Sequence, residues 1–424
     1  MSVVPVPEGS DFPLENLPYG VFDAGDGPRI GVALGDHVVD LRSARPALPS
    51  EAAEALAEET LNPFLGLGRN AWQETRLALT DLLGDDDTSG LSIHERSSVE
   101  MRLPFVPGDY VDFYSSIEHA TNLGKMFRPD SEPLLPNWRH LPVGYHGRSG
   151  TVVVSGTPIT RPSGQTQTGD DPPVYGPTKA LDIELEVGFV TGPGNALGEP
   201  IDVDDAGDHI FGMVLVNDWS ARDIQRWEYV PLGPFLGKSF ATTISPWVVT
   251  IEALTPYLVP SPPQDPEPLE YLRASGDWAV DMELEILLKT PGLKEPRTVS
   301  RTNFSSMYWT MAQQLAHATV NGATVRPGDL FASGTVSGSI PGTYGSLIEL
   351  TWKGENPINL PDGTERRFLE DGDTVILRGW CERDGEARIG FGDCVGTVLP
   401  AVTEGIGNRA PAGPPSSPVR DGRS

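Results

Sequence analysis

Short apolar runs separated by glycine and proline limit how this chain can fold more than any other feature of its sequence. The 424 residues include 47 glycines and 41 prolines, which interrupt helices and favour the turns between short strands. The runs predicted to form strands are Thr151–Val154, Leu181–Val190, Ile210–Val216, Met282–Leu288, Leu347–Trp352, Thr374–Arg378 and Cys394–Leu399. This pattern indicates a mainly β (α+β) protein built around an antiparallel barrel or roll.

The N-terminal part of the chain has a different pattern and is predicted to form a separate small domain. Arg29–Leu34 and Gly35–Leu41 have the pattern of two strands joined by a Gly-Asp turn. Glu51–Glu58 and Asn70–Leu83 repeat apolar residues at helical spacing. The segment Leu103–Gly108 contains two prolines and marks a boundary. We therefore expect a small β domain with helices at 1–105 and a larger domain at 106–402.

The larger domain and the end of the chain contain two further predicted features. A helix is expected over Phe304–Val320, with Asn303 as its N-cap. The tail 403–424 is rich in proline, glycine, arginine and serine and has too little apolar surface to order itself, so it is expected to be disordered.

Composition excludes several classes of partner. The net charge is −28 and the pI is about 4.5, which opposes binding to nucleic acid or to an anionic membrane. No window of 18 uninterrupted apolar residues is present. Two cysteines, Cys381 and Cys394, are too few for a disulfide framework. We expect a cytoplasmic protein that binds neither nucleic acid nor membrane.

Two acidic segments alternate carboxylates with apolar residues. In the first, at 181–187, a strand would place Asp182, Glu184 and Glu186 on one face. Three adjacent carboxylates suit a hard cation such as Mg²⁺ or Ca²⁺. The same pattern recurs at 281–285, where nothing suggests a metal. The pattern alone therefore leaves two interpretations open, a cation site and the solvated face of a half-buried strand.

A dense set of polar residues follows the apolar run before Asn217–Trp247. The residues that supply a carboxylate, a guanidinium, an amide, a phenol and an ammonium there are Asp218, Arg222, Gln225, Tyr229 and Lys238. Upstream, His119 could act as a base near neutral pH, although a single histidine is more often a structural hydrogen bonder. Arg128 and Tyr145 could clamp a substrate carboxylate, or they could be a surface arginine and a core tyrosine.

Six sequence motifs, taken in chain order, resemble those of the fumarylacetoacetate hydrolase family. The motifs are Asp112-Phe-Tyr-Ser-Ser, Leu135-Pro-Asn-Trp, Leu141-Pro-Val-Gly-Tyr-His-Gly-Arg, Asn217-Asp-Trp-Ser-Ala-Arg-Asp, Pro231-Leu-Gly-Pro-Phe-Leu-Gly-Lys and Ala332-Ser-Gly-Thr. The resemblance runs from Ser10 to Pro400 and implies an N-terminal SH3-like β-barrel with helices, followed by a mixed β-roll catalytic domain. It also implies a homodimer.

The resemblance assigns roles to individual residues. The implied ligands of Mg²⁺ or Ca²⁺ are Asp112, Glu184, Glu186 and Asp218, with Lys238 and Thr242 lining the region of a second cation. His119 matches the catalytic base, Glu349 matches the residue that orients it, and Asp182 matches no ligand. The residues implied to stabilise developing negative charge are Arg222, Gln225 and Lys238. The residues implied to contact substrate are Tyr114, Arg128, Tyr145, Gln225, Tyr229 and Thr335.

The implied reaction is hydrolysis of 4-fumarylacetoacetate to fumarate and acetoacetate, the last step of tyrosine and phenylalanine degradation. His119 would take a proton from water, and the resulting hydroxide would add to a carbonyl carbon before the carbon–carbon bond breaks. Two alternatives remain open at the level of sequence. One is another lyase, isomerase or decarboxylase acting on β-diketones or oxo acids, and the other is a non-catalytic, metal-stabilised protein that binds a dicarboxylate.

Overall fold

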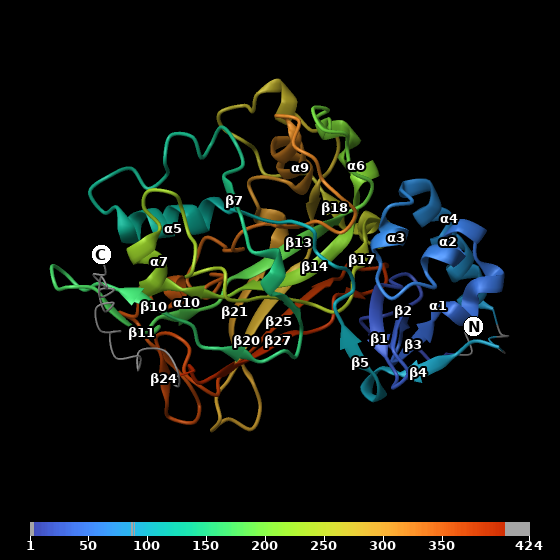
Figure 1. Ribbon diagram of the computed structural model, residues 1–424, viewed down its shortest axis with the longest axis horizontal. Helices are drawn as coiled ribbons and strands as arrows, with labels where there is room; N and C mark the ends of the chain where they lie inside the picture. The colour runs from blue at the N-terminus through green and yellow to red at the C-terminus, as the bar shows by residue number, and fades with distance from the viewer. Residues whose placement is uncertain (1–3, 86–87, 89, 403–424) are drawn as a thin grey trace, which may run out of the picture.

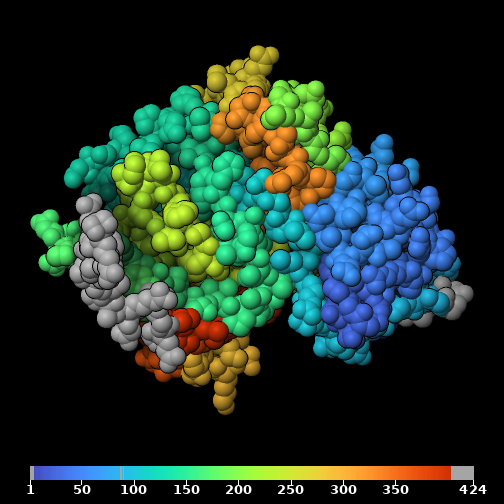
Figure 2. Space-filling model, viewed as in Figure 1, coloured from blue at the N-terminus to red at the C-terminus, as the bar shows by residue number. Residues whose placement is uncertain are grey.

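The computed structural model describes residues 4–85, 88 and 90–402, so the tail 403–424, predicted to be disordered, lies outside the described residues. Figure 1 shows the N-terminal residues, in blue, as a compact unit beside a larger unit built from the rest of the chain. The space-filling view in Figure 2 shows the same two units in contact. The expected mainly β, α+β class is confirmed.

The N-terminal unit is a five-stranded antiparallel sheet with helices packed on it. The strand order is β4-β3-β2-β1-β5. The strands are β1 (Tyr19–Asp23), β2 (Pro28–Leu34), β3 (His37–Asp40), β4 (Ile93–Glu95) and β5 (Glu100–Arg102). The helices are α1 (Leu41–Ala44), α2 (Ser50–Ala55), α3 (Asn62–Leu65) and α4 (Arg69–Gly84). The predicted Gly-Asp turn joins β2 to β3, and both predicted helices are present, although α2 ends three residues earlier than expected.

Two large sheets form the frame of the larger unit. The first has the order β7-β6-β22-β13-β14-β16-β8, with β17 also paired to β14. Its strands are β6 (Tyr110–Phe113), β7 (Gly144–His146), β8 (Val152–Val154), β13 (Leu185–Thr191), β14 (Ile210–Asp218), β16 (Thr242–Ile244), β17 (Val249–Thr250) and β22 (Leu330–Ala332). Most pairs are antiparallel, as expected, but β6 with β22 and β8 with β16 are parallel.

The second sheet has the order β21-β20-β25-β27-β9, with β26 paired to β25. Its strands are β9 (Ile159–Thr160), β20 (Glu283–Lys289), β21 (Arg297–Asn303), β25 (Thr374–Cys381), β26 (Ile389–Gly390) and β27 (Cys394–Leu399). Leu215 of the first sheet shares one buried apolar cluster with Leu284, Leu377 and Val398 of the second. The main core therefore lies between the two sheets.

Shorter elements surround this frame. Four small pairings are β10 (Ser163–Thr166) with β11 (Val174–Pro177), β12 (Leu181–Asp182) with β15 (Ser220–Ala221), β18 (Leu258–Val259) with β19 (Ala279–Val280), and β23 (Ile358–Asn359) with β24 (Glu365–Arg366). The helices are α5 (Ile117–Phe127), α6 (Ala206–His209), α7 (Arg222–Glu228), α8 (Ile251–Leu254), α9 (Met311–Thr319) and α10 (Leu347–Leu350). Single 3₁₀ turns occur at Arg45–Ala47, Arg96–Ser98, Ser149–Thr151, Val203–Asp205, Thr255–Tyr257, Glu270–Leu272 and Phe304–Ser306.

The central strand β14 explains why its sequence is apolar without alternation. All nine of its residues are buried. Met213 and Leu215 belong to the core between the two sheets, while Val214 and Val216 belong to the core shared with the N-terminal unit. Because successive side chains of a strand point to opposite faces, both faces must be apolar here. The strand ends at Asp218, which it carries from the core into the candidate site.

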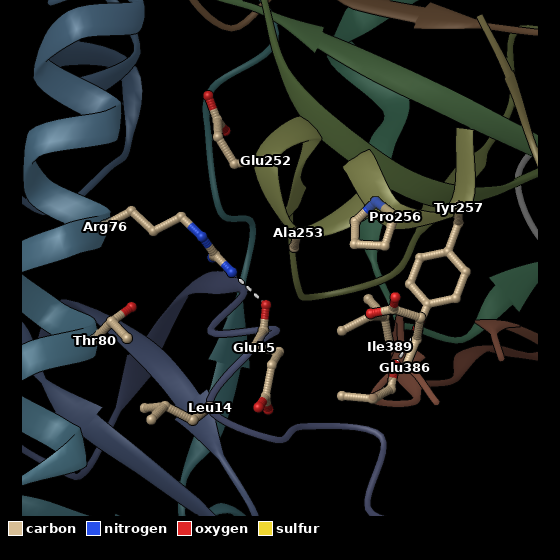
Figure 3. A pocket seen from close by; sticks show the side chains of 11 residues that line it. Leu14, Glu15, Arg76, Thr80, Glu252, Ala253, Pro256, Tyr257, Glu386 and Ile389 are labelled. Carbon is tan, nitrogen blue, oxygen red and sulfur yellow. Dashed lines mark hydrogen bonds between the residues drawn. The ribbon is translucent and has the colours of Figure 1, made fainter. Parts of the chain in front are cut away.

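Aromatic packing joins the N-terminal unit to the larger one. Phe211 of β14 lies 5.6 Å from Tyr19, 5.8 Å from Phe64 and 5.1 Å from Trp72, measured between ring centroids. A cavity of about 310 Å³ opens between residues of the two units, and Figure 3 shows the side chains that line it. Arg76 of α4 points into it and donates to the backbone carbonyl of Glu15. The guanidinium therefore holds the chain segment that enters the first strand.

Two predicted elements are wrong. Leu347–Trp352, predicted to be a strand, forms α10 and a turn, because Asp182 accepts hydrogen bonds from the first two amides of this short helix. The long helix predicted over 304–320 is a 3₁₀ turn followed by the separate helix α9. Thr310 starts α9 through a capping box with Gln313, while Asn303 caps only the 3₁₀ turn.

None of the helices in the described part of the chain combines the length and the apolar character that spanning a membrane requires.

Candidate active site

Neighbouring strands bring four acidic residues to one place in the first sheet. The sheet order places β6, β22, β13 and β14 side by side. Asp112 lies on β6, Glu186 on β13 and Asp218 at the end of β14, while Glu184 directly precedes β13. One carboxylate oxygen from each residue lies within 4.8 Å of those of the others, and all four side chains are buried. The structure therefore assembles this group from residues as far apart in sequence as Asp112 and Asp218.

Charges in the acidic group are unevenly compensated. The Lys238 ammonium contacts the carboxylates of Glu184 and Asp218, whereas Asp112 and Glu186 have no lysine or arginine within 4.0 Å in the described part of the chain. Asp112 Oδ1 and Glu186 Oε1 are also buried without a hydrogen-bond partner. Two orphaned carboxylate oxygens facing the same group are costly unless something binds them.

The pKa values of the carboxylates depend on whether a lysine or arginine contacts them. Burial raises the pKa of Asp112 well above its ordinary value, and the Asp218 carboxylate raises it further. Burial and the neighbouring Asp112 likewise raise the pKa of Glu186. Burial opposes ionisation of Glu184 too, but Lys238 and the Arg222 guanidinium outweigh it and hold the pKa of Glu184 below its usual range.

These residues fit a divalent cation. Carboxylate oxygens are the preferred ligands of Mg²⁺ and Ca²⁺, and four of them converge here with two oxygens unpaired. A doubly charged ion would remove the repulsion that raises the pKa values of Asp112 and Glu186. Within the described ranges this is the single group of acidic, histidine or cysteine side chains close enough to share an ion.

His119 and Glu349 form a buried pair beside the acidic group. His119 is the third residue of α5, and its backbone amide donates to the N-cap side chain of Ser116. Its Nδ1 lies 2.7 Å from Glu349 Oε2, and its Nε2 lies 3.9 Å from Glu184 Oε1. A histidine that donates through Nδ1 leaves Nε2 as the acceptor. The free nitrogen therefore faces the carboxylates.

Glu349 is held by more than His119. Its Oε2 accepts from the hydroxyls of Ser337 at 2.8 Å and Ser346 at 2.7 Å, and its Oε1 accepts from Asn122 Nδ2 at 2.9 Å. Burial alone would raise its pKa, but the adjacent imidazole and these donors hold the pKa of Glu349 below its ordinary value. Glu349 is therefore an ionised, immobile partner for the imidazole.

Arg222 begins α7 on the other side of the group. Its Nη2 lies 2.8 Å from Glu184 Oε1, and its Nη1 donates to Gln225 Oε1 at 3.3 Å. Lys238 lies in a loop that approaches α7 closely, because a Cβ atom on Gly237 would lie 2.8 Å from the backbone of Gln225. Burial lowers the pKa of Lys238, but the carboxylates of Asp218 and Glu184 raise it above its ordinary value. Both cations are therefore charged at neutral pH.

Three of the residues predicted to contact substrate line the same site. The Tyr114 ring lies 5.3 Å from the His119 ring, and the Tyr145 hydroxyl donates to Asp218 Oδ2 at 3.2 Å. Thr335 Oγ1 is buried without a partner, and the amide of the residue before it donates to Glu186 Oε2 at 3.2 Å. Thr335 follows Gly334, which has φ +80° and could not carry a Cβ atom because that atom would lie 2.3 Å from the carbonyl of Phe113.

Two other residues predicted to contact substrate, Arg128 and Tyr229, do not contact the acidic group. Arg128, after the end of α5, donates to the carbonyl of Pro133 at 2.7 Å, and Tyr229 is 49% exposed. Neither has a hydrogen bond or ion pair to the four acidic residues among the described contacts. Thr242, on β16, places its Oγ1 3.4 Å from Asp218 Oδ1, and Lys238 contacts the same carboxylate.

Sequence reasoning missed three residues that support this site, namely Asn122, Ser337 and Ser346, and it assigned no role to Asp182, which binds Arg222. The three that hold Glu349 are small polar residues without a periodic pattern. Asp182 was visible as part of the first acidic segment but matched no ligand.

The chain matches two family models and is similar in sequence to known proteins over nearly its whole length. Residues 15–104 match the family model described as fumarylacetoacetase N-terminal, and residues 110–399 match fumarylacetoacetate (FAA) hydrolase C-terminal. The chain is 55% identical to fumarylacetoacetase of Homo sapiens over 418 residues, covering 95% of this chain and 99% of the relative. It is 49% identical to fumarylacetoacetase of Arabidopsis thaliana over 416 residues, covering 94% and 98%.

Solved structures show the fold alone at much lower identity. A fumarylacetoacetate hydrolase from Exiguobacterium antarcticum superposes with a TM-score of 0.54 at 18% identity, covering 91% of this chain and 99% of that one. A maleylpyruvate hydrolase from Sphingobium superposes with a TM-score of 0.50 at 14% identity, covering 91% and 100%.

Proposed function

The chain belongs to the fumarylacetoacetase family and is a hydrolase of that family, and we propose that it uses His119 to activate the water that cleaves 4-fumarylacetoacetate. The similarity to curated fumarylacetoacetases over nearly the whole chain supports the reaction. The observation that carries the role of His119 is its buried contact with Glu349 at 2.7 Å, which leaves Nε2 free toward the acidic group. Fumarate and acetoacetate are the products.

Each proposed step has a residue to perform it. His119 Nε2 takes a proton from water, and the hydroxide adds to the carbonyl carbon next to the bond that breaks. Glu349 fixes the tautomer and stabilises the imidazolium. As the new C–O double bond forms, the carbon–carbon bond breaks and its electron pair leaves with the acetoacetate carbon as an enolate. The proton on His119 then returns to that carbon, so the imidazole is regenerated.

Three donors are proposed to stabilise the negative charge that develops on oxygen, and these are Arg222, Gln225 and Lys238. Their support is that Arg222 and Lys238 are buried and fixed by carboxylates before substrate arrives, so they need no reorganisation during the reaction. Each preorganised donor of this kind is worth about 3 kcal/mol of transition-state stabilisation.

The residues proposed to hold a divalent cation are Asp112, Glu184, Glu186 and Asp218. A bound Mg²⁺ or Ca²⁺ would supply Lewis-acid polarisation of substrate oxygens. Lys238 and Thr242 are proposed to line a second cation region, which their positions beside Asp218 support.

The substrate carries carboxylates, carbonyls and an apolar chain. We assign its contacts to Tyr114, Arg128, Tyr145, Gln225, Tyr229 and Thr335. Thr335 Oγ1 and Arg128 Nε are buried without partners in the described structure, so each has a donor free for substrate oxygens. Tyr229, at the exposed edge, would contact the outer end of the substrate.

Several coarser properties are also proposed. We divide the chain into an SH3-like domain at 1–105, a catalytic domain at 106–402 and a tail at 403–424, which the family-model limits support. The net charge of −28 supports the absence of nucleic-acid and membrane partners. A homodimer in the cytoplasm is the expected form.

The direct test is the loss of the ultraviolet absorbance of 4-fumarylacetoacetate on addition of enzyme. Hydrolysis should release fumarate and acetoacetate in equal amounts. Release of carbon dioxide, or isomerisation without cleavage, would instead favour an oxo-acid decarboxylase or isomerase. Binding without turnover would favour a dicarboxylate-binding protein.

A further inference from the structure

Asp182 is a buried carboxylate that contacts Arg222 and α10, and the proposed reaction assigns it no task. Its side chain is fully buried. It lies on β12, paired with Ser220 of β15, and therefore next to the start of α7. This position brings one carboxylate between the helix that carries Arg222 and the helix that carries Glu349.

One contact of Asp182 fixes Arg222. Asp182 Oδ2 accepts from Arg222 Nε at 2.7 Å, while the two terminal nitrogens of the guanidinium contact Glu184 and Gln225. A guanidinium held at Nε can present its two terminal nitrogens in a fixed direction. Asp182 therefore sets the orientation in which Arg222 meets the site.

Two further contacts of Asp182 fix α10. Asp182 Oδ1 accepts from the backbone amide of Leu347 at 2.8 Å, and Oδ2 accepts from that of Ile348 at 3.1 Å. These are the first two residues of the helix, and Glu349 is the third. The N-cap residue Ser346 makes no side-chain cap, because its hydroxyl donates to Glu349 instead. Asp182 takes over the capping that a local residue ordinarily provides.

We propose that Asp182 is a positioning residue that couples the two halves of the catalytic apparatus, the charge-stabilising Arg222 and the His119–Glu349 pair. By capping α10, Asp182 holds Glu349 against His119. It also leaves the Ser346 hydroxyl free to donate to the Glu349 carboxylate. By binding Nε it aims Arg222. The inference rests on the proposed function, since it gives Asp182 a task only if both groups act in the reaction.

The test compares Asp182→Asn with a matched control, Asp373→Asn. Asp373 is equally buried, accepts from Nε of the buried Arg366 at 2.7 Å and accepts from the Glu370 amide at 2.8 Å, but it does not contact the proposed catalytic residues. Steady-state kinetics with 4-fumarylacetoacetate and thermal unfolding are measured for both variants and for the unaltered protein.

We expect Asp182→Asn to lower kcat about 100-fold while KM changes by less than about threefold, because misplaced groups act on the transition state more than on binding. Asp373→Asn should lower the thermal midpoint by a similar amount and leave kcat within about twofold of the unaltered enzyme. Asp182→Asn combined with Arg222→Gln should lose less than the product of the two single losses, because the residues act as a unit.

Three results would overturn the positioning role. The first is a kcat for Asp182→Asn within about threefold of the unaltered enzyme. The second is multiplication of the two losses in the double variant, which would show that Asp182 does not act through Arg222. If Asp182→Asn does not fold, Asp182→Glu, which keeps the charge and moves it by one methylene, supplies the same comparison. The third overturning result is that neither variant folds, which would make Asp182 a residue required for folding. Absence of hydrolysis by the unaltered protein would instead refute the proposed function.

Discussion

The segments 181–187 and 281–285 have the same alternation of acidic and apolar residues in different surroundings. Glu184 and Glu186 of the first are buried beside two further carboxylates, and oxygens there lack partners. In the second, Asp281 and Glu283 accept from Asn303, each at 2.9 Å. Glu285 accepts from Arg301 Nε at 2.9 Å, and that arginine is 66% exposed. The second segment is an ordinary strand in which every carboxylate has a partner.

The two segments differ in the residues that neighbouring strands place beside them. The first segment continues into β13, which pairs with β14 and β22. β14 brings Asp218, and β6, on the far side of β22, brings Asp112. The second, on β20, pairs with β21 and β25, which bring arginines opposite Glu285. Because strand neighbours are distant in sequence, alternation alone cannot distinguish a cation site from a paired strand. Four variants test this difference, from the largest expected effect to the smallest.

The largest effect should come from His119→Ala, because it removes the base that faces the first segment. We expect kcat to fall about 10⁴-fold, the upper range for loss of a general base, while the fold and divalent-ion binding are retained. Stopped-flow or steady-state measurement of substrate absorbance gives the rate. His94→Ala, a histidine of β4 bonded to Ser92, is the control and should keep full activity. Normal turnover by His119→Ala would end the assignment of the base.

Glu349→Gln tests whether the imidazole needs an ionised partner. We expect kcat to fall about 10³-fold, since the amide cannot stabilise the imidazolium. Glu118→Gln, on the same helix as His119, is the control and should leave kcat unchanged. A kcat within about tenfold of the unaltered enzyme would show that a neutral side chain at position 349, held by Ser337 and Asn122, is a sufficient partner for the imidazole.

The same variant should change the pH dependence of stability. The pKa of Glu349 in the folded protein lies below its ordinary value of 4.5. The ionised carboxylate therefore stabilises the fold above that pH, and the stabilisation is lost as the pH falls through the folded-state pKa. Thermal midpoints of Glu349→Gln should decline less steeply below pH 4.5 than those of the unaltered protein. Parallel curves would contradict the lowered pKa.

Ion binding compares the two acidic segments directly. Protein treated with a chelator and dialysed is titrated with MgCl₂ or CaCl₂ in a calorimeter. Glu186→Gln should weaken binding by at least about 100-fold, more than the loss of an outer-shell partner does, and chelation of the unaltered protein should abolish activity reversibly. Glu285→Gln should bind the ion normally. Equal affinity of the two variants would remove the distinction between the segments.

Sequence reasoning reached the strands, the first acidic segment and the contact between His119 and Glu349, the last through family resemblance. It failed where a distant residue decides the local structure. Leu347–Trp352 alternates like a strand, but Asp182, 165 positions before Leu347, caps its first amides and makes it helical. Likewise, Asn122 and Ser337 reach Glu349 only because the fold closes around it. Hydrophobic periodicity reports which face is buried, and it carries no information on which polar side chain lies opposite.

The smallest effect should come from Glu285→Gln measured as stability. Glu285 is buried, but its partner Arg301 is largely exposed, so water screens the pair. The side-chain amide introduced by this substitution could still accept from Thr298, which donates to Glu285 Oε1 at 2.7 Å in the unaltered protein. We therefore expect the free energy of unfolding in urea to fall by only about 1 kcal/mol, with kcat and KM unchanged. Arg301→Gln should give a loss of the same size, and the double variant little more, because the two residues share one interaction. A loss above about 3 kcal/mol would mean that the second segment also holds an uncompensated buried charge, and the contrast with the first segment would then be one of degree.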